Sequence, residues 1–264
     1  MAGTTALGRA LERVAAWTGL GERRCRVCGH IAATSVAVEA ASGPALCAPC
    51  RAAVTPRAGG FCTCCGALVG DDKDEPGLCG ECLAQARPWR RVMVGNAYAG
   101  QLRRMILEYK FSGRLALGAA LGRMALDLWL AREHVFPPQA QGAGEHEAML
   151  VVPVPLHTKR LIRRGFNQSL ELARPLAHHL GVDADAAALV RTRDTKPQMS
   201  LSRTERAGNL KGAFRADPAR VAGKTVLLVD DIFTTGATIN EAALALSQAG
   251  ARAVDALVLV GTLE

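Results

Sequence analysis

The fold of this chain is decided by residues 226–238, which read Val226-Leu227-Leu228-Val229-Asp230-Asp231-Ile232-Phe233-Thr234-Thr235-Gly236-Ala237-Thr238. The first four are apolar, which is typical of a parallel strand covered on both faces. Two aspartates then fall at the carboxyl end of that strand, where open α/β sheets bind their ligands. The stretch therefore predicts a ligand site at this strand end.

The residues after the aspartates predict the start of a helix, because apolar side chains take helical spacing from Thr238 onward. Backbone N–H groups at a helix start, aided by threonine hydroxyls, form a natural phosphate cradle. A plain helix cap is the alternative, since Thr, Asp and Gly are common at such positions. Two adjacent carboxylates repel each other, however, and this favours a bound ligand over a cap.

Composition excludes several classes of protein. The chain has 264 residues and 49% hydrophobic residues, which indicates a globular protein with one full domain and a smaller one. No apolar run approaches the roughly 20 residues needed to cross a bilayer, so we expect no membrane insertion. Arg9, Glu12 and Arg13 interrupt any signal-peptide core, and residues 1–23 are therefore expected to form a helical segment.

The net charge of +8 is concentrated in two segments. Residues 151–174 carry five basic side chains against one acid, and residues 191–215 carry seven against two. Such clusters attract polyanions, either a pyrophosphate-bearing metabolite or a nucleic acid. An ordinary solvated basic face is the alternative.

Nine cysteines lie between Cys25 and Cys82, and none follow. Eight of them form the C-x-x-C pairs Cys25/Cys28, Cys47/Cys50, Cys62/Cys65 and Cys79/Cys82. Two such pairs supply four thiolates for one tetrahedral zinc ion, so consecutive pairing predicts a double zinc ribbon over residues 24–86. Disulfides would need an oxidising compartment, and a redox pair would not occur four times. Cys64 leaves the register of the third pair open.

The rest of the chain, residues 87–264, alternates between strand and helix patterns, which indicates a parallel α/β sheet flanked by helices. Strands are expected at residues 92–98 and 149–154, and helices at residues 101–110, 115–132 and 166–180. Lys110, which precedes a Phe and a Ser-Gly pair, either reaches a phosphate or lies along the surface with its apolar stem.

Three further motifs suit anionic ligands. Pro153, Val154 and Pro155 end a strand in a rigid loop. Arg164 precedes a glycine and two amides at a helix start, which favours anionic oxygen. The polar stretch over residues 198–214, with Arg203 and Arg206, is expected to close over a bound ligand.

Taken together, these motifs resemble the ComF family, which joins an N-terminal double zinc ribbon to a domain like the type I phosphoribosyltransferases. The resemblance rests on the four C-x-x-C pairs, residues 153–156, 164–168 and 198–209, and the Asp-Asp-x-x-Thr-Thr-Gly loop. It implies a link to natural transformation, which is the uptake of single-stranded DNA, and a cytoplasmic location. The implied cofactors are two structural Zn²⁺ ions and a Mg²⁺ ion bound with phosphoribosyl pyrophosphate.

The resemblance also implies roles for individual residues. Asp230 and Asp231 would orient the ribose, and Thr234, Thr235, Gly236, Ala237 and Thr238 would seat the 5′-phosphate. The loop of Pro153, Val154 and Pro155 would meet the pyrophosphate, with Arg164, Arg203 and Arg206 as further anion ligands. C1 of the ribose would lose pyrophosphate through an oxocarbenium-like state.

Two classes of function follow. One is an enzyme that transfers a phosphoribosyl group to an acceptor that the sequence does not identify. The other is a binding protein that senses the metabolite, or holds single-stranded DNA and docks to DNA-uptake proteins through its ribbons. The acid pair and the threonine loop favour ligand binding in both.

Overall fold

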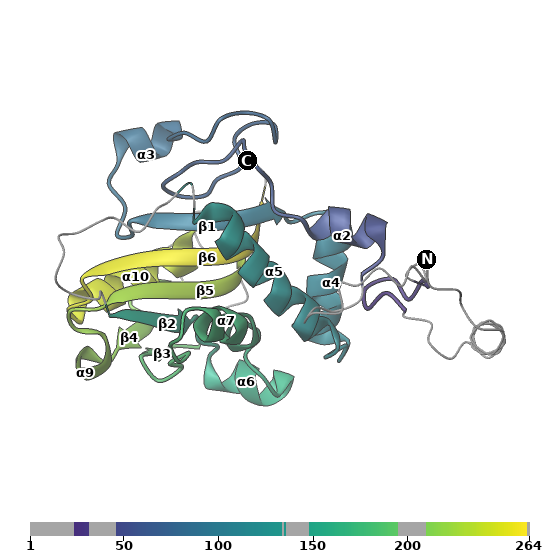
Figure 1. Cartoon of the computed structure of the whole chain (residues 1–264). Coiled ribbons are helices and arrows are strands. Elements are labelled where there is room, and N and C mark those ends of the chain that lie inside the picture. The colour runs from purple at the N-terminus through teal and green to yellow at the C-terminus, as the bar shows by residue number, and fades with distance from the viewer. Residues whose placement is uncertain (1–23, 32–45, 134, 136–147, 195–209, 263–264) are drawn as a thin grey trace, which may run out of the picture. The chain divides into compact units, whose positions relative to one another are not determined.

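The computed structural model describes residues 24–31, 46–133, 135, 148–194 and 210–262. The chain divides into two compact units, residues 1–53 and 54–264. The smaller unit holds the first cysteine group and most of helix α2 (Ala48–Val54). The larger unit holds the second cysteine group and every strand that the structure describes (Figure 1). The boundaries expected at residues 23/24 and 86/87 stay predictions, and the expected N-terminal helix lies outside the described residues.

The larger unit is built on a four-stranded parallel sheet with the order β1-β6-β5-β2. Its strands are β1 (Arg91–Ala97), β2 (Met149–Pro153), β5 (Thr225–Phe233) and β6 (Ala253–Gly261). The first seven residues of β5 are buried without alternation, as a strand covered on both faces requires. The parallel α/β sheet expected from the sequence is confirmed.

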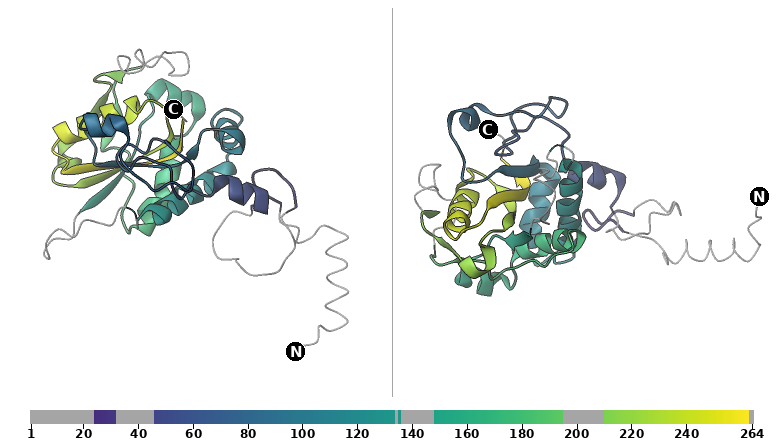
Figure 2. Two further views of the ribbon diagram at one scale, coloured as in Figure 1. Left: turned by 90° about the horizontal axis from the view of Figure 1, so that it is seen from above. Right: turned by 60° about the vertical axis from the view of Figure 1, so that its left-hand side comes forward.

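Helices cover both faces of this sheet. Helices α5 (Leu117–Arg132) and α7 (Gln168–His179) pack on each other and on one face, while α10 (Ala237–Gln248) lies on the opposite face (Figures 1 and 2). The remaining elements are α3 (Gly80–Ala84), α4 (Gly100–Phe111), α6 (Thr158–Arg164), α9 (Pro218–Val221) and the antiparallel pair β3 (Leu189–Arg191) and β4 (Phe214–Ala216). Within the described ranges, no helix combines the length and apolarity needed to cross a bilayer.

Most elements differ from the expected bounds by one or two residues, and two of the differences have identifiable reasons. The helix expected from residue 166 begins at Gln168, because the Asn167 side chain accepts a hydrogen bond from the N–H of Ser169 and caps it. Strand β5 continues past the aspartates to Phe233, because β6 pairs alongside it as far as Gly261. Asp230 and Asp231 therefore lie within the last four residues of the strand, not after it.

The segment that carries the second cysteine group covers the outer edge of β1. The N–H of Val92 donates to the carbonyl of Cys64 at 2.8 Å, and the N–H of Arg57 donates to the carbonyl of Gly95 at 3.0 Å. Cys62 and Cys65 are buried in the same hydrophobic cluster as the sheet. An exposed strand edge is a template for wrong pairing, so this segment protects the sheet.

A buried ion-pair network fixes β1 beside β6. The Asp255 side chain, only 1% exposed, binds Arg90 through two hydrogen bonds of 2.9 and 2.7 Å. Arg91 donates to the same carboxylate at 3.2 Å, and Arg91 is also the register partner of Asp255 across the two strands. Because both oxygens of this buried acid are bound, it stabilises the pairing at the start of β1.

Candidate functional site

The acid pair lies in the interior at the carboxyl end of β5. Asp230 is 8% exposed and Asp231 is 6% exposed. Oδ1 of Asp230 accepts a hydrogen bond from the Ser169 hydroxyl at 3.0 Å and another from the N–H of Asp231 at 2.9 Å. Ser169 is the second residue of α7, so the start of that helix places a hydrogen-bond donor at the end of β5.

Burial and the neighbouring carboxylate change the protonation of Asp230. Burial, and then the negative charge of Asp231, raise the pKa of Asp230 to about 7, although Lys110 and the hydrogen bonds act in the opposite direction. Near neutral pH part of the population therefore carries a proton on Asp230. A carboxyl pair in that state offers both a donor and acceptors to a ligand.

Lys110 is the ion-pair partner of the second aspartate. Its Nζ lies 2.5 Å from Oδ2 of Asp231, and the lysine side chain is 12% exposed. Oδ2 of Asp231 is buried without a well-aligned hydrogen bond among the described residues, so the contact is an ion pair rather than a hydrogen bond. Lys110 therefore does not lie along the surface, and the alternative in which it reaches a phosphate stays a prediction.

The loop after β5 turns sharply at Gly236 into helix α10. Gly236 caps α10 with a φ of 73°, a conformation that glycine adopts at low cost. A Cβ at this position would lie 2.8 Å from the ring of Phe233, so the loop also needs a residue that has no side chain. Oγ1 of Thr235 is buried without a hydrogen-bond partner in the described part of the chain. Ala237 and Thr238 form the first turn of α10.

The loop after β2 lies beside the acid pair. Pro153 is the register partner of Val229, and the N–H of Val154 donates to the carbonyl of Val229 at 2.9 Å. The Asn167 amide donates to the carbonyl of Val154 at 3.2 Å and so ties this loop to the start of α7. Pro155 follows directly. This arrangement brings the two expected loops to adjacent strand ends of one sheet.

Arg164 lies in the last turn of α6 and is half-buried. Its Nη1 donates to Oε1 of Gln168 at 2.5 Å, and its guanidinium lies 5.3 Å from the ring centroid of Phe111. The charges of Asp231 and Asp230 both act on it electrostatically. Arg164 is thus near the acid pair, whereas Arg203, Arg206 and the rest of residues 198–209 lie outside the described residues.

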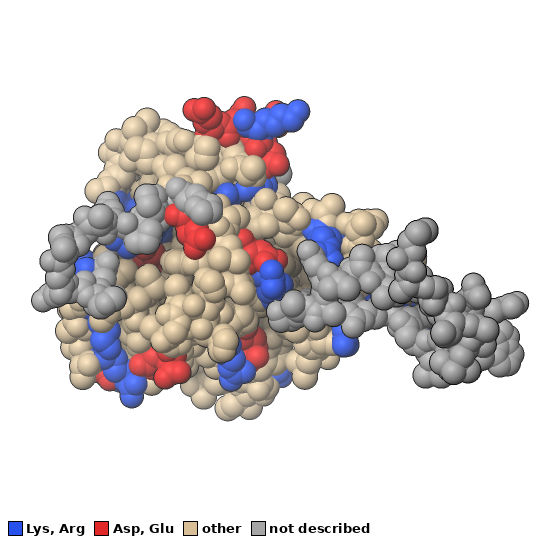
Figure 3. Space-filling view, viewed as in Figure 1, with Lys and Arg blue, Asp and Glu red and all other residues tan. Residues whose placement is uncertain are grey.

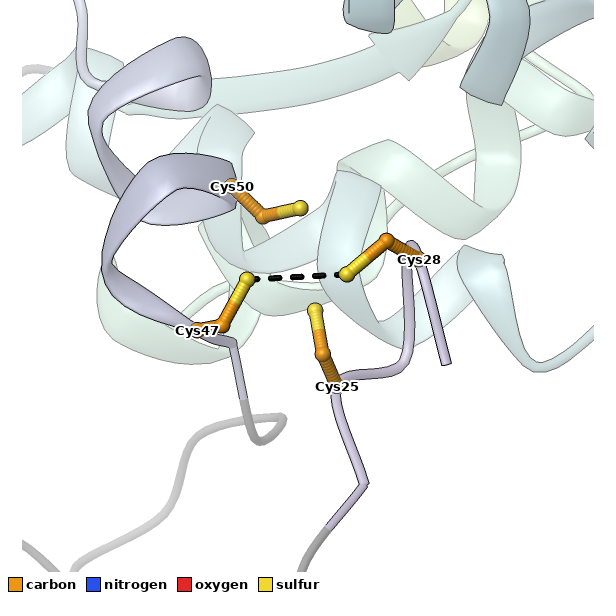
Figure 4. Close-up of side chains that lie close together, drawn as sticks. All are labelled: Cys25, Cys28, Cys47 and Cys50. Carbon is orange, nitrogen blue, oxygen red and sulfur yellow. Dashed lines mark hydrogen bonds between the residues drawn. The ribbon is translucent and has the colours of Figure 1, made fainter. Parts of the chain in front are cut away.

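The cysteines form the two groups that consecutive pairing predicts, and all nine are free thiols. Within each group the four sulfurs lie within 4.8 Å of one another; the groups are Cys25, Cys28, Cys47, Cys50 and Cys62, Cys65, Cys79, Cys82. In the first group the four side chains converge from two segments of the chain (Figure 4). Four thiols around one centre fit the tetrahedral coordination of Zn²⁺, so both groups could hold zinc.

Backbone N–H groups favour the thiolate form of Cys62 in the second group. Sγ of Cys62 accepts hydrogen bonds from the N–H groups of Cys64, Cys65 and Cys79, at 3.3 to 3.5 Å. Burial acts against the thiolate, but these bonds outweigh it and lower the pKa of Cys62 to about 7. Cys65, not Cys64, completes the third pair, which resolves the register.

The sequence pattern did not single out Ser169 as a site residue. Serine at the start of a helix is usually assigned to capping, and its contact with Asp230 spans 61 residues of sequence. The one available signal was the position of Ser169 directly after the Asn-Gln pair at an expected ligand-facing helix start. Long-range contacts of this kind depend on how α7 packs against β5.

Replacing ligands in the two cysteine groups should have unequal effects. In Cys25→Ser/Cys28→Ser, we expect a zinc content of about one per chain and an unchanged main unfolding transition, because these cysteines lie in the smaller unit. In Cys62→Ser/Cys65→Ser, the main transition should fall by roughly 10 °C, because the second group belongs to the core of the sheet. Metal analysis and calorimetry measure both. Equal shifts of the main transition in the two variants would contradict this assignment.

The raised pKa of Asp230 predicts a pH-dependent stability. Between about pH 4 and pH 7 the folded chain holds a proton on Asp230 that the unfolded chain has released, so this group lowers the free energy of unfolding as pH rises. Asp230→Asn mimics the protonated carboxyl and removes this dependence. The stability of Asp230→Asn relative to the native protein, measured by urea unfolding, should therefore increase from pH 5.5 to pH 8, by up to about 1.4 kcal/mol per pH unit. A constant difference would show that Asp230 is ionised throughout.

Comparison with known proteins places this site in a described family. A family model for the phosphoribosyl transferase domain matches residues 167–264, which include the acid pair and the threonine loop. DNA utilization protein YhgH of Salmonella typhi is 37% identical over 220 residues, covering 83% of this chain and 91% of the relative. The Escherichia coli K12 protein of the same name is 37% identical over 232 residues, covering 83% and 98%.

Competence protein F of Haemophilus influenzae is 31% identical over 177 residues, which cover 65% of this chain and 73% of that protein. These relatives, the phosphoribosyl transferase domain and the two groups of four cysteines agree with the resemblance seen in the sequence. The chain belongs to the ComF family.

Proposed function

We propose that the acid pair and the threonine loop bind phosphoribosyl pyrophosphate together with Mg²⁺. One observation carries the proposal: Oγ1 of Thr235 is buried just after β5 without a hydrogen bond among the described residues, and the buried Oδ2 of Asp231 has only the ion pair with Lys110 as its described contact. Buried polar atoms without partners are rare because each costs free energy. Ribose hydroxyls and phosphate oxygens would supply these partners, and the phosphoribosyl transferase domain match supports such a ligand.

In this proposal Asp230 and Asp231 hold the ribose. When Asp230 carries its proton, the pair presents a donor and several acceptors, which suits two neighbouring hydroxyls that each donate and accept. The Ser169 hydroxyl fixes the orientation of Asp230, because its hydrogen bond occupies Oδ1. Oδ2 of Asp231 contacts Lys110, so the ligand would bind the other oxygens of the pair.

The 5′-phosphate would lie at the start of α10. Thr234, Thr235 and Gly236 form the loop, and Ala237 and Thr238 supply N–H groups of the first helical turn. The positive φ of Gly236 allows the chain to turn sharply before the helix. The helix macrodipole adds a favourable field for an anion at this end.

The pyrophosphate would lie against the loop of Pro153, Val154 and Pro155, which the Asn167 amide and the β5 backbone hold in place. Arg164, on which the charges of both aspartates act, is a candidate cation for that role together with Arg203 and Arg206. Mg²⁺, when bound with the ligand, would offset the charge of the pyrophosphate. Transfer of the phosphoribosyl group to an acceptor, and sensing of the metabolite without transfer, both begin with this binding step.

The names of the relatives support a proposal about the cellular process in which this chain acts. Proteins called DNA utilization protein and competence protein F suggest that this chain also acts in DNA uptake, in the cytoplasm and with DNA-uptake proteins as partners. Zinc in both cysteine groups would then have a structural role, since four thiolates leave no open coordination position.

Calorimetry with phosphoribosyl pyrophosphate and Mg²⁺ tests the binding site directly. The native protein should bind, and Asp230→Asn/Asp231→Asn should lose most of the affinity, because amides replace the two carboxyls that would hold the ribose. Asp127→Asn, which changes an exposed acid on α5, is the matched control and should bind as the native protein does. Absence of binding heat with the native protein would contradict the assignment of a phosphoribosyl pyrophosphate site. If binding occurs, release of pyrophosphate with a panel of bases separates an enzyme from a sensor.

A second function, binding of single-stranded DNA, is favoured by an exposed aromatic side chain. Phe111 is 60% exposed at the end of α4 and lies beside Arg164. Aromatic faces next to cationic side chains stack the bases of single strands. On the face drawn in Figure 3, acidic and basic side chains of the described residues are interspersed, so stacking is a sharper test than charge alone.

Fluorescence anisotropy with a labelled oligothymidylate tests this second function. The affinity should fall as salt increases, and Phe111→Ala should weaken it about tenfold at fixed salt, because one stacked base is lost. Leu115→Ala removes an equally exposed apolar side chain that cannot stack, and it should leave binding unchanged. Absence of binding at low salt, or equal losses in the two variants, would exclude Phe111 as a base platform.

A further inference from the structure

The two aspartates at the end of β5 are held in different ways. Oδ1 of Asp230 is fixed by the Ser169 hydroxyl and the N–H of Asp231, both of which belong to regular elements. The described contact of the Asp231 carboxylate is the ion pair between its Oδ2 and Nζ of Lys110. One acid is therefore locked by hydrogen bonds, and the other is held by a cation on another helix.

Lys110 is well placed to hold Asp231 and also to leave it. Its helix, α4, is anchored by Leu102, Met105, Ile106 and Tyr109, which are buried. Lys110 itself follows these anchors in the last turn, where a positive charge interacts favourably with the helix macrodipole. Its ammonium is a point charge on a flexible four-carbon stem, and it does not form a bidentate clamp on the carboxylate as an arginine would.

We propose that Lys110 is a displaceable counterion that occupies, in the free protein, the position of a ligand-borne cation beside Asp231. This inference rests on the proposed function, because the cation that replaces Lys110 would arrive with phosphoribosyl pyrophosphate. In the free protein the ammonium offsets the repulsion between the two carboxyls. A ligand without a cation of its own would have to break the ion pair without compensation. The ion pair between Lys110 and Asp231 therefore favours the Mg²⁺-bound form of the ligand.

The released ammonium would remain inside the site. Lys110 Nζ starts 2.5 Å from Asp231, and the loop after β2 lies next to the acids through the pairing of Pro153 with Val229. An ammonium that leaves the carboxylate would therefore be close to the proposed position of the pyrophosphate. Lys110 would then change partner from a carboxylate to a phosphate.

Binding of Mn²⁺ alone to the zinc-loaded full chain, followed by electron paramagnetic resonance, tests the counterion without phosphoribosyl pyrophosphate. Lys110→Met should bind one Mn²⁺ at least about tenfold more tightly than the native protein, because a ligand that must displace a resident group loses apparent affinity. Lys110→Gln, which keeps a polar end without charge, should show the same gain and serves if Lys110→Met does not fold. Adding Asp231→Asn to either variant should abolish the gain.

Lys224→Met is the matched control for the loss of one positive charge. Lys224 directly precedes Thr225 at the opposite end of β5 from the acids, so this variant should bind Mn²⁺ as weakly as the native protein. Equal Mn²⁺ affinity in the native protein and in both Lys110 variants would overturn the inference, as would a gain that survives Asp231→Asn. A native protein that fails to bind phosphoribosyl pyrophosphate with Mg²⁺ would remove the proposed function but not the Mn²⁺ result, so the two failures are distinguishable.

Discussion

The site depends on the burial of two adjacent carboxyls, Asp230 and Asp231, in an inner strand of a parallel sheet. Burial of a charged group costs free energy, and a second charge next to it raises that cost. The fold offsets the cost with a hydroxyl from α7 on Asp230 and an ammonium from α4 on Asp231. Two helices, α7 and α4, therefore each place one side chain on the acids of β5.

The second cysteine group contributes to the same arrangement from the far edge of the sheet. It covers β1, which pairs with β6, and β6 in turn pairs along the full described length of β5. Cys62 and Cys65 belong to the core that contains Val226, Leu228 and the buried residues of α10. Zinc in this group would stabilise the sheet that positions the acids, whereas the first group lies in a separate unit. The two cysteine groups are alike in sequence but differ in what depends on them.

Local sequence patterns predicted much of this structure. The apolar run before Asp230, the helical spacing after Thr238 and the C-x-x-C spacing each depend on neighbours within a few residues, and the structure confirms the strand, the helix and the two cysteine groups. The contacts that complete the site are long-range: Ser169 and Lys110 reach the acids across 61 and 121 residues of sequence. No local pattern encodes such a contact, because it depends on how whole helices pack against the sheet. The membership of the second cysteine group in the sheet core was hidden for the same reason.

The buried acids of this sheet also show how a ligand site differs from a structural ion pair. Asp255 is more deeply buried than the acid pair, and Arg90 and Arg91 bind both of its oxygens and leave nothing for a ligand. Asp231, two strand positions from the end of β5, has a lysine in place of such a network. Stability of the sheet alone would favour an acid whose oxygens are all bonded, as in Asp255. Asp231 is incompletely bonded, and it is therefore the acid that fits a ligand. The contrast within one sheet supports reading the end of β5 as a binding site rather than as part of the scaffold.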